Sequence, residues 1–293
     1  MAYEIGTQVP YSTGRNNPII SIPENACDSH HHIYDPIQYP YQPTDTRNQP
    51  PATVECYQLL QKRLGTTRNV IIQPSAYGTD NRCTLDALKK MGVKNTRAVV
   101  VVNDDISESE LIEMDALGVR GVRVNISCGA ADDLDSIQKI AEKIAPLHWS
   151  MCFWMSADLT VSIESFLRNL PCEIVFDHRG HIPADLGIHH PAFNIICDML
   201  RDNKAWVKLS GLYMDSKKAD FSDTIAVGKG YVEANPDRCL WGTDWPHPRC
   251  YTNHEDMPND SDMLDDLMKQ AGTEENLRKI LVDNPARLFD FKA

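Results

Sequence analysis

The chain has 293 residues, of which 42% are hydrophobic and 24% are charged, a composition typical of a globular protein with a substantial core. Its formal net charge of -12 argues against sequence-independent binding to nucleic acids, which needs a basic surface, and weakly against docking on anionic membranes. No apolar stretch approaches the roughly 20 residues that a membrane span needs.

The nine cysteines are scattered along the chain, odd in number and without any CxxC pair. This spacing is typical of reduced thiols buried as small hydrophobic side chains, and it disfavours a zinc finger or a disulfide framework. The N-terminus lacks the basic segment and apolar run of a secretory signal peptide. We therefore expect a cytoplasmic protein.

Residues 1–25 are polar, contain prolines and show no periodicity, which predicts an N-terminal arm laid over the surface. After the arm, short β-branched runs alternate with helical periods. The predicted strands are residues 26–30, 69–74, 97–102, 120–125, 150–155, 172–177, 205–210 and 238–243. The predicted helices are residues 53–64, 81–91, 107–117, 133–146, 159–168, 191–202, 219–235 and 261–283.

This alternation of strands and helices predicts an α/β fold. Eight strands, each followed by a helix, within 293 residues favour a single (β/α)8 TIM barrel over residues 26–293, with helices at its C-terminal end. A doubly wound open sheet is the alternative, but no glycine-rich phosphate turn follows the first strand. No repeat or linker indicates a second domain.

Two histidines, His30 and His32, follow Asp28 at the end of the first predicted strand. Because side chains two residues apart project from the same face of a strand, the two imidazoles should lie side by side. Histidine is the commonest metal ligand and titrates nearest to neutral pH. Such a pair can bind a metal or polarise a carbonyl group, which indicates an enzyme; a chance cluster in a solvated loop is the alternative.

Two further predicted strands end on side chains of the same chemical kind. His178 ends the sixth strand, and Asp244 ends the eighth. Catalytic residues of (β/α)8 barrels lie at the C-terminal ends of the strands. Because the first and last strands are neighbours in a closed barrel, we expect Asp244 to face His30 and His32 across the barrel mouth.

These motifs resemble those of the amidohydrolase superfamily, and more narrowly the branch that contains 2-pyrone-4,6-dicarboxylate lactonase and related lactone hydrolases. The resemblance rests on the DxHxH start, the Phe-Asp-His sequence that ends at His178, the Trp-Gly-Thr-Asp-Trp-Pro-His segment at 241–247 and the Asn-Pro-Ala-Arg-Leu-Phe tail at 284–289. It extends from about residue 24 to the end of the chain. It implies a barrel enzyme that opens a lactone.

Lactone hydrolysis needs a nucleophilic water, a base that takes its proton and donors for the oxyanion. Asp244 is the predicted base, because a carboxylate is ionised at neutral pH. We expect His30, His32 and His178 to point toward the carbonyl oxygen, where each good donor contributes about 3 kcal/mol of transition-state stabilisation. Because a lactone has a far better leaving group than an amide, these groups can suffice without a metal.

The wider superfamily implies one or two divalent ions at these His and Asp positions, with a carboxylated Lys or a Glu on a middle strand. Here the fourth and fifth strands end Val-Arg-Val-Asn and Phe-Trp-Met-Ser, which argues against a two-metal site. A site for a single Zn2+ remains an alternative, because His and Asp are good zinc ligands. Its ligands would be His30, His32, His178 and Asp244. The lactonase branch implies a reaction without metal, and we therefore expect that no cofactor is required.

An acidic protein that acts on an anion needs local cations, and Arg123 is the first candidate because a guanidinium matches a carboxylate bidentately. Arg120 lies on the same predicted strand, and the two-residue strand period can place it on the face of Arg123. A substrate contact and a structural ion pair are equally good interpretations of Arg120. For Arg179 and Lys208 a structural salt bridge is at least as good an interpretation. The predicted substrate-binding residues are Arg123, Arg47, Ser75, Tyr77, Trp154 and Lys208.

Two departures from the lactonase branch bear on the substrate. The resemblance implies an Arg where this chain has Ser127-Cys128-Gly129, and another Arg near His181. The loss of two guanidinium groups argues against a dicarboxylate. Hydroxyl groups near the predicted rim, including those of Ser75 and Tyr77, favour a sugar-acid or muconolactone-type ring over a flat pyrone.

The sequence therefore predicts a hydrolase that opens a small carboxylated lactone of the muconolactone, pyrone or sugar-acid type. A lactone isomerase on the same site, in which Asp244 deprotonates a substrate hydroxyl, is the close alternative. A zinc-dependent, non-hydrolytic decarboxylase and a barrel that binds without catalysis are the others. The expected partner is the small anionic lactone that serves as the substrate. The sequence leaves the oligomeric state undecided, and a homo-oligomer is one alternative.

Overall fold

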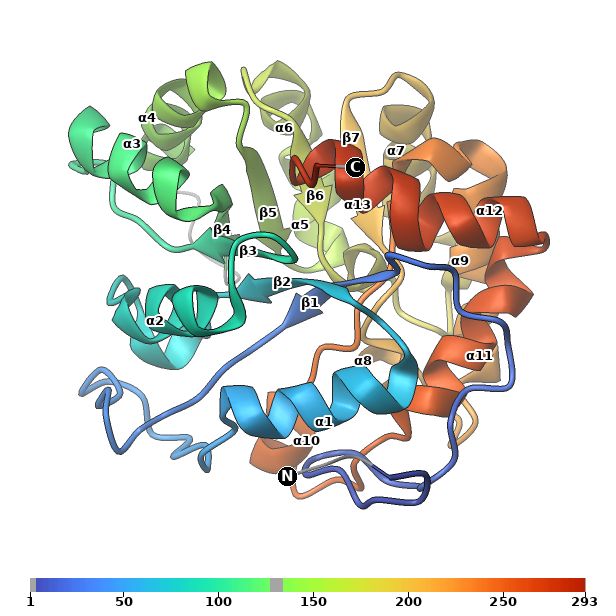
Figure 1. Ribbon diagram of the computed structural model, residues 1–293. Helices are drawn as coiled ribbons and strands as arrows, with labels where there is room; N and C mark the ends of the chain where they lie inside the picture. Colours follow the sequence, from blue (N-terminus) through green and yellow to red (C-terminus); the bar gives the residue numbers. More distant parts are fainter. Residues whose placement is uncertain (1–3, 127–133, 293) are drawn as a thin grey trace.

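The computed structural model describes residues 4–126 and 134–292. Eight strands form one sheet in chain order, every pair of successive strands is parallel, and helices surround the sheet (Figure 1). The strands are Cys27–His31 (β1), Arg68–Ile72 (β2), Thr96–Val100 (β3), Val119–Asn125 (β4), Ser150–Trp154 (β5), Ile174–Phe176 (β6), Ala205–Lys208 (β7) and Cys239–Leu240 (β8). This arrangement confirms the predicted (β/α)8 fold.

Backbone hydrogen bonds between β1 and the chain around the end of β8 close the sheet into a barrel. The N–H of Ser29 donates to the carbonyl of Trp241 over 2.8 Å, and the N–H of Asp244 donates to the carbonyl of His30 over 2.8 Å. Only glycine fits at position 242, because a Cβ on Gly242 would lie 2.6 Å from both the backbone nitrogen and the Cβ of His30. The closure brings Asp244 next to the histidines of β1.

The side chain of Asp28 also links β1 to the chain after β8, a contact that is called the seam of the barrel below. Its carboxylate accepts hydrogen bonds from the N–H of Thr243 (3.0 Å), from the hydroxyl of Thr243 (2.7 Å) and from the hydroxyl of Tyr57 (3.0 Å). Burial raises the pKa of Asp28 to about 6, although these hydrogen bonds oppose the shift. The first aspartate of the DxHxH motif therefore positions the end of β8.

The helices cover the outside of the barrel, and none of those in the described ranges is long and apolar enough to cross a membrane. The helices are Val54–Leu64 (α1), Arg82–Met91 (α2), Glu108–Leu117 (α3), Leu134–Ile144 (α4), Ala157–Ser162 (α5), Glu164–Asn169 (α6), Pro191–Arg201 (α7), Leu212–Asp215 (α8), Ile225–Ala234 (α9), Pro248–Asn253 (α10), Asp260–Ala271 (α11), Glu274–Arg278 (α12) and Asn284–Leu288 (α13).

Local signals divide or shorten three of the predicted helices. The predicted helix 159–168 is two helices, α5 and α6, which meet at Ile163, where φ is -113° and ψ is 19°. The predicted helix 261–283 breaks at Gly272, whose φ of +73° ends α11, and Thr273 then caps α12. The predicted helix 219–235 begins as an α-helix only at Ile225. The sequence pattern did not predict the short helices α8 and α10.

The residues before β1 run along α1 and α11 on the outside of the barrel (Figure 1). The guanidinium of Arg63 in α1 donates to the carbonyl of Thr13 over 3.3 Å. The carboxylate of Asp265 in α11 accepts a hydrogen bond from the N–H of Ile19 over 2.8 Å. We propose that the chain is one barrel domain with this arm laid on its surface.

Candidate active site

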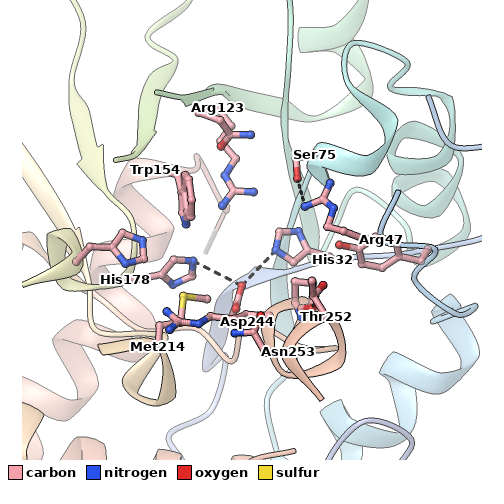
Figure 2. Close-up of a pocket in the computed structure, with 15 residues that line it drawn as sticks. His32, Arg47, Ser75, Arg123, Trp154, His178, Met214, Asp244, Thr252 and Asn253 are labelled. Carbon is pink, nitrogen blue, oxygen red and sulfur yellow. Dashed lines mark hydrogen bonds and ion pairs between the residues drawn. The ribbon is translucent and has the colours of Figure 1, made fainter. Parts of the chain in front are cut away.

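A cavity of about 360 Å³ opens at the C-terminal ends of the strands, where barrel enzymes carry their active sites (Figure 2). This volume is near the lower end of the range for ligand pockets, so the cavity suits a small molecule. The cavity brings together these predicted site residues: Asp244, His32, His178, Arg123, Arg47, Ser75 and Trp154.

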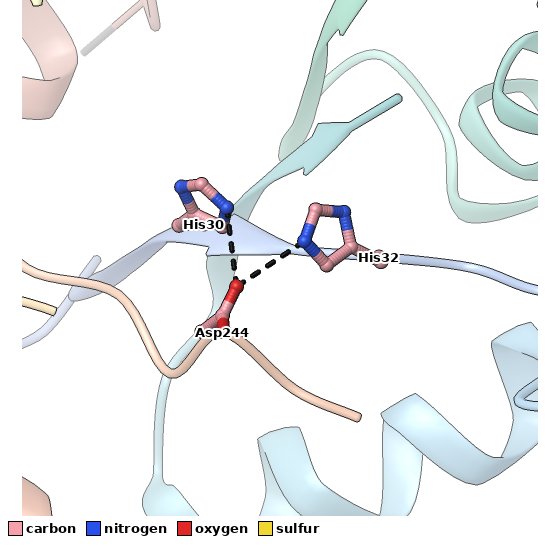
Figure 3. A group of neighbouring side chains, drawn as sticks. All are labelled: His30, His32 and Asp244. Carbon is pink, nitrogen blue, oxygen red and sulfur yellow. Dashed lines mark hydrogen bonds and ion pairs between the residues drawn. The ribbon is translucent and has the colours of Figure 1, made fainter. Parts of the chain in front are cut away.

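Asp244 lies at the floor of the cavity among imidazoles. Its Oδ1 atom is 3.2 Å from Nε2 of His32 and 3.3 Å from Nε2 of His30 (Figure 3). Nε2 of His178 lies 3.6 Å from the same oxygen. The other carboxylate oxygen, Oδ2, accepts a hydrogen bond from the hydroxyl of Tyr213.

The electrostatic surroundings of Asp244 keep it ionised. Burial opposes the charge, but His178 and His30 outweigh burial and hold the pKa of Asp244 well below its usual range. The backbone at Asp244 has a φ of +62°, a conformation that few non-glycine residues adopt and that is common at functional sites. The fold therefore presents a buried anion in one fixed orientation.

The proton of His32 is placed by a backbone carbonyl. Nδ1 of His32 lies 2.8 Å from the carbonyl oxygen of Ile72, which can only accept a hydrogen bond, so Nδ1 carries the proton. Burial lowers the pKa of His32 to about 4, and the ring is therefore neutral at pH 7. Its Nε2 lone pair then faces the carboxylate of Asp244. Nε2 of His32 and Oδ1 of Asp244 are then two neighbouring acceptors, which can bind either the hydrogens of one water molecule or a cation.

His30 has the opposite arrangement. Nζ of Lys208 lies 3.2 Å from Nδ1 of His30, and an ammonium only donates, so Nδ1 accepts and the ring carries its proton on Nε2, 3.3 Å from Oδ1 of Asp244. His30 is fully buried and does not line the cavity. The same ammonium lies 3.0 Å from Oδ1 of Asp177, which fixes it in place. His30 thus contacts Asp244 from beneath the cavity floor.

His178 lines the cavity and is held by the loop after β7. Its Nδ1 atom lies 2.9 Å from the hydroxyl of Ser210. Gly211 makes room for the ring, because a Cβ there would lie 2.8 Å from Nδ1 of His178. Burial lowers the pKa of His178 well below its usual range, and Nε2 is buried without a hydrogen bond to any described residue.

The spacing of these side chains fits one divalent cation. The ligand atoms of His30, His32 and Asp244 lie within 4.8 Å of one another. A zinc ligand needs a free lone pair, which His32 offers on Nε2, whereas the hydrogen bond from Lys208 places a proton on Nε2 of His30. The geometry therefore fits Zn2+ on condition that His30 first exchanges this proton.

Arg123 supplies positive charge to the wall of the cavity. Its Nε atom donates to Oδ2 of Asp177 over 3.2 Å. The rest of the guanidinium points toward the space between His178 and His32 (Figure 2). Because Asp177 also pairs with Lys208, two buried cations share one carboxylate, and a net positive charge remains beside the cavity.

Arg47 and Ser75 line the opposite wall together. The Arg47 guanidinium donates to the hydroxyl of Ser75 over 2.9 Å and pairs with Asp45, which neutralises its charge. Trp154 lines the cavity and is 39% exposed. Tyr77 is buried outside the cavity lining, where its hydroxyl accepts a hydrogen bond from the N–H of Asp35 over 2.8 Å.

The remaining predicted cations lie away from the cavity. Lys208 is buried beneath the floor, next to His30. Arg179 is buried and donates to the carbonyl of Ser210 over 2.6 Å. Arg120 pairs with Asp115 and Asp290 near the opposite ends of the strands. The departure at residues 127–129 lies outside the described ranges.

Several residues of the site lie in segments that show neither a motif nor a hydrophobic period. Tyr213 and Met214 lie on α8, and Arg249, Thr252 and Asn253 lie on α10 or at its end. Both helices are too short to show a 3.6-residue period. Their position directly after β7 and β8 is the signal that would have identified them, because the loops after barrel strands build the active site.

A family model described as Amidohydrolase matches residues 27–291. The chain belongs to the amidohydrolase family. This amidohydrolase is 34% identical to the 2-pyrone-4,6-dicarboxylate hydrolase of Comamonas testosteroni, over 94% of this chain and 93% of the relative. It is 33% identical to the 4-sulfomuconolactone hydrolase of Hydrogenophaga intermedia, over 93% of this chain and 91% of the relative.

A solved structure has the same fold as this amidohydrolase. It is a probable 2-pyrone-4,6-dicarboxylic acid hydrolase from Acinetobacter baumannii with citric acid bound, which superposes with a TM-score of 0.80 at 25% identity and covers 91% of this chain and 100% of that chain. Together the comparisons confirm the resemblance to the lactonase branch that the motifs indicated.

Proposed function

We propose that this amidohydrolase hydrolyses a small lactone that carries a carboxylate, with Asp244 as the base that activates water. The observation that carries the proposal is a buried, ionised carboxylate, surrounded by imidazoles, at the floor of a small cavity with a guanidinium in its wall. The two curated relatives bear the names of lactone hydrolases, which supports the reaction class.

The water molecule binds beside Oδ1 of Asp244 and Nε2 of His32, two atoms that lie 3.2 Å from each other. Both atoms accept a hydrogen bond, so the water oxygen keeps its lone pairs for the carbonyl carbon of the substrate. Asp244 takes the proton as the water attacks, and such base catalysis contributes roughly 10²- to 10⁴-fold to the rate. His30 acts through Asp244: its Nε2 proton faces Oδ1 and holds the carboxylate in place.

His178 is the proposed donor for the oxyanion. When the hydroxyl of Ser210 donates to Nδ1, the proton of the neutral His178 ring lies on Nε2. This N–H forms no hydrogen bond with a described residue, although Oδ1 of Asp244 lies 3.6 Å away, and it borders the cavity, so it can donate to the carbonyl oxygen. One such donor stabilises the transition state by about 3 kcal/mol.

Arg123 binds the substrate carboxylate, because its guanidinium is held by Asp177 on one side and faces the cavity on the other. Arg249 on α10 borders the same cavity, is exposed and forms no ion pair with a described residue. It offers a second contact for an anionic substrate. The hydroxyl groups of Ser75 and Thr252 border the cavity as well and suit a ring with hydroxyl substituents.

The proposed reaction requires no metal. If one divalent cation were bound, His32 and Asp244 would hold it with His30, and it would supply Lewis-acid polarisation of the lactone carbonyl. The proton that Lys208 keeps on Nε2 of His30 favours the metal-free form. We therefore expect that dialysis against a chelator leaves the rate unchanged, with metal content measured on the same sample.

A screen of carboxylated lactones in 18O-labelled water tests the proposal. We expect one 18O atom in the carboxylate that ring opening creates, and a loss of roughly 10²- to 10⁴-fold in kcat for Asp244→Asn, which keeps the shape but removes the base. Arg82→Gln, on the exposed surface of α2, is the control and should keep kcat unchanged. A product without label would favour lactone isomerisation and overturn hydrolysis.

A further inference from the structure

A second cavity, of about 520 Å³, lies at the opposite end of the barrel, and basic side chains dominate its lining. Three neighbouring strands each bring an arginine to it within their first two residues: Arg68 in β2, Arg97 in β3 and Arg120 in β4. The charged lining residues are Arg68, Arg97, Arg120, Lys94, Lys292, Asp115 and Asp290. Five positive and two negative groups meet here, on a chain whose net charge is -12.

The two carboxylates pair with only one of the arginines. Asp115 lies 3.1 Å and Asp290 lies 3.2 Å from the guanidinium of Arg120. Arg68 and Arg97 are each only 6% exposed, and neither pairs with a carboxylate of the described residues within 4.0 Å. No carboxylate of the described residues therefore pairs directly with these two charges, and the more distant Asp290 offsets that of Arg97 only in part.

Neutral groups take the hydrogen bonds of these two arginines. Arg97 donates to the carbonyl of Phe289 over 3.0 Å, and Arg68 donates to the carbonyl of Lys292 over 2.8 Å. Nε of Arg68 is buried and has no hydrogen-bond partner among the described residues. Carbonyl groups satisfy N–H donors without cancelling a full charge, and a buried charge is costly unless it is paired.

The two guanidinium groups also share one aromatic ring. Their central carbons lie 5.2 Å (Arg68) and 4.6 Å (Arg97) from the centre of the Phe291 ring. Burial, together with the charges of Arg120 and Arg68, lowers the pKa of Arg97. Packing thus holds like charges together at this end of the barrel.

We propose that this cavity binds a multivalent oxyanion of the phosphate class. The Arg68 guanidinium, whose Nε has no partner among the described residues, matches the oxygens of such an ion in geometry and charge. Arg97 donates mostly to carbonyls and adds its charge, and Lys94 and Lys292 add point charges at the exposed side. The bound ion joins the starts of β2, β3 and β4 to the segment after α13. Because the catalytic cavity opens at the other end of the strands, the ion stabilises the fold without contacting the substrate.

Thermal unfolding and calorimetric titration of the full-length chain with inorganic phosphate test this site, with chloride at matched ionic strength as the reference. A ligand that binds only the folded state raises Tm, and at 100 times its dissociation constant we expect a rise of roughly 5 to 10 °C. Titration should show one phosphate per chain. The exposed Lys94→Gln should reduce the rise in Tm by half or more, and Arg68→Gln should abolish it.

Two controls distinguish this site from other effects of phosphate. Lys229→Gln, on the exposed face of α9, should keep the full rise, and so should Arg123→Gln in the catalytic cavity. An equal rise in Lys94→Gln and the unchanged protein, a loss of the rise in Arg123→Gln, or no rise at all would each overturn the proposal. These readouts do not depend on lactone hydrolysis and stay valid if the proposed function is wrong.

Discussion

The carbonyl of Ile72 and the ammonium of Lys208 place the protons of two histidines that stand only two residues apart. One contact puts the proton of His32 on Nδ1, and the other puts the proton of His30 on Nε2. The N–H of His30 and the lone pair of His32 therefore face the same carboxylate oxygen, 3.3 Å and 3.2 Å away. Two identical side chains acquire different tasks because different groups contact their far nitrogens.

Arg123 gives the prediction at the scale of a single residue. A lysine at this position keeps the charge but loses the bidentate geometry and the Nε contact with Asp177. We expect Arg123→Lys to raise KM for a carboxylated lactone by roughly 10- to 100-fold, the size of a charge-assisted hydrogen bond, with a smaller change in kcat. Steady-state kinetics measure both constants.

Arg120→Lys is the matched control, since Arg120 lies on the same strand but pairs with Asp115 at the other end of the barrel. It should leave KM for the lactone unchanged. If both variants raised KM equally, Arg123 would owe its effect to the stability of β4 and would not be a substrate contact.

At the scale of elements, two short helices complete a site that the strands begin. β1, β6 and β8 deliver the histidines and Asp244, while α8 and α10 bring Tyr213 and Arg249. The seam between β1 and the end of β8 decides whether these groups meet. Asp28 and Gly242 hold that seam, the first by hydrogen bonds and the second by its lack of a side chain.

Gly242→Ala tests the seam. The added methyl group would lie 2.6 Å from the backbone of His30, so β1 must move away from the chain after β8. We expect a loss of about 1–3 kcal/mol in the free energy of unfolding, measured in urea, together with a large loss of kcat.

Gly272→Ala separates the two effects. This glycine has a φ of +73°, but a Cβ there would meet nothing within 4 Å. The variant should lose about 1 kcal/mol of stability to backbone strain and keep its kcat. Full activity in Gly242→Ala would show that the contact between β1 and the end of β8 does not position the catalytic groups.

At the scale of the whole molecule, buried titratable groups make stability depend on pH. Burial lowers the pKa of His31 to about 3 and that of His32 to about 4, whereas an unfolded histidine has a pKa near 6.5. Between these values the unfolded chain binds protons that the folded chain excludes, so stability falls as pH drops below about 6.5. Asp28, with its pKa raised to about 6, binds a proton in the folded state and partly opposes the fall.

His31→Gln isolates one of these protons. The ring of His31 stacks on Tyr57 and its Nε2 lies 3.0 Å from the side-chain oxygen of Asn69, outside the cavity. Between pH 5 and 6 we expect the variant to lose about 1.4 kcal/mol less stability per pH unit than the unchanged protein. Urea unfolding at several pH values measures the two slopes, and equal slopes would mean that His31 is protonated in the folded state.

The pattern of residues along the chain was enough to predict the barrel and the polar side chains at the ends of its strands. Eight apolar runs with helices between them leave few other topologies, and residues at strand ends meet because parallel strands share one rim. The motifs around His30, His178 and Asp244 likewise sufficed to indicate the family, since they are local in the chain. The predicted helix 261–283 missed the break at Gly272, because the hydrophobic period continues past it and only the capping residues mark it.

How deep each site residue lies, and which groups it contacts, became clear only from the packing of the folded chain. That His30 and Lys208 lie beneath the cavity floor, while Arg249 borders the cavity, depends on how neighbouring strands and short helices pack. Strand alternation gives the face of a side chain but not its distance from the rim. No local sequence pattern predicted that Arg68 and Arg97 meet at the other end of the barrel, because residues that are distant in the chain create that contact.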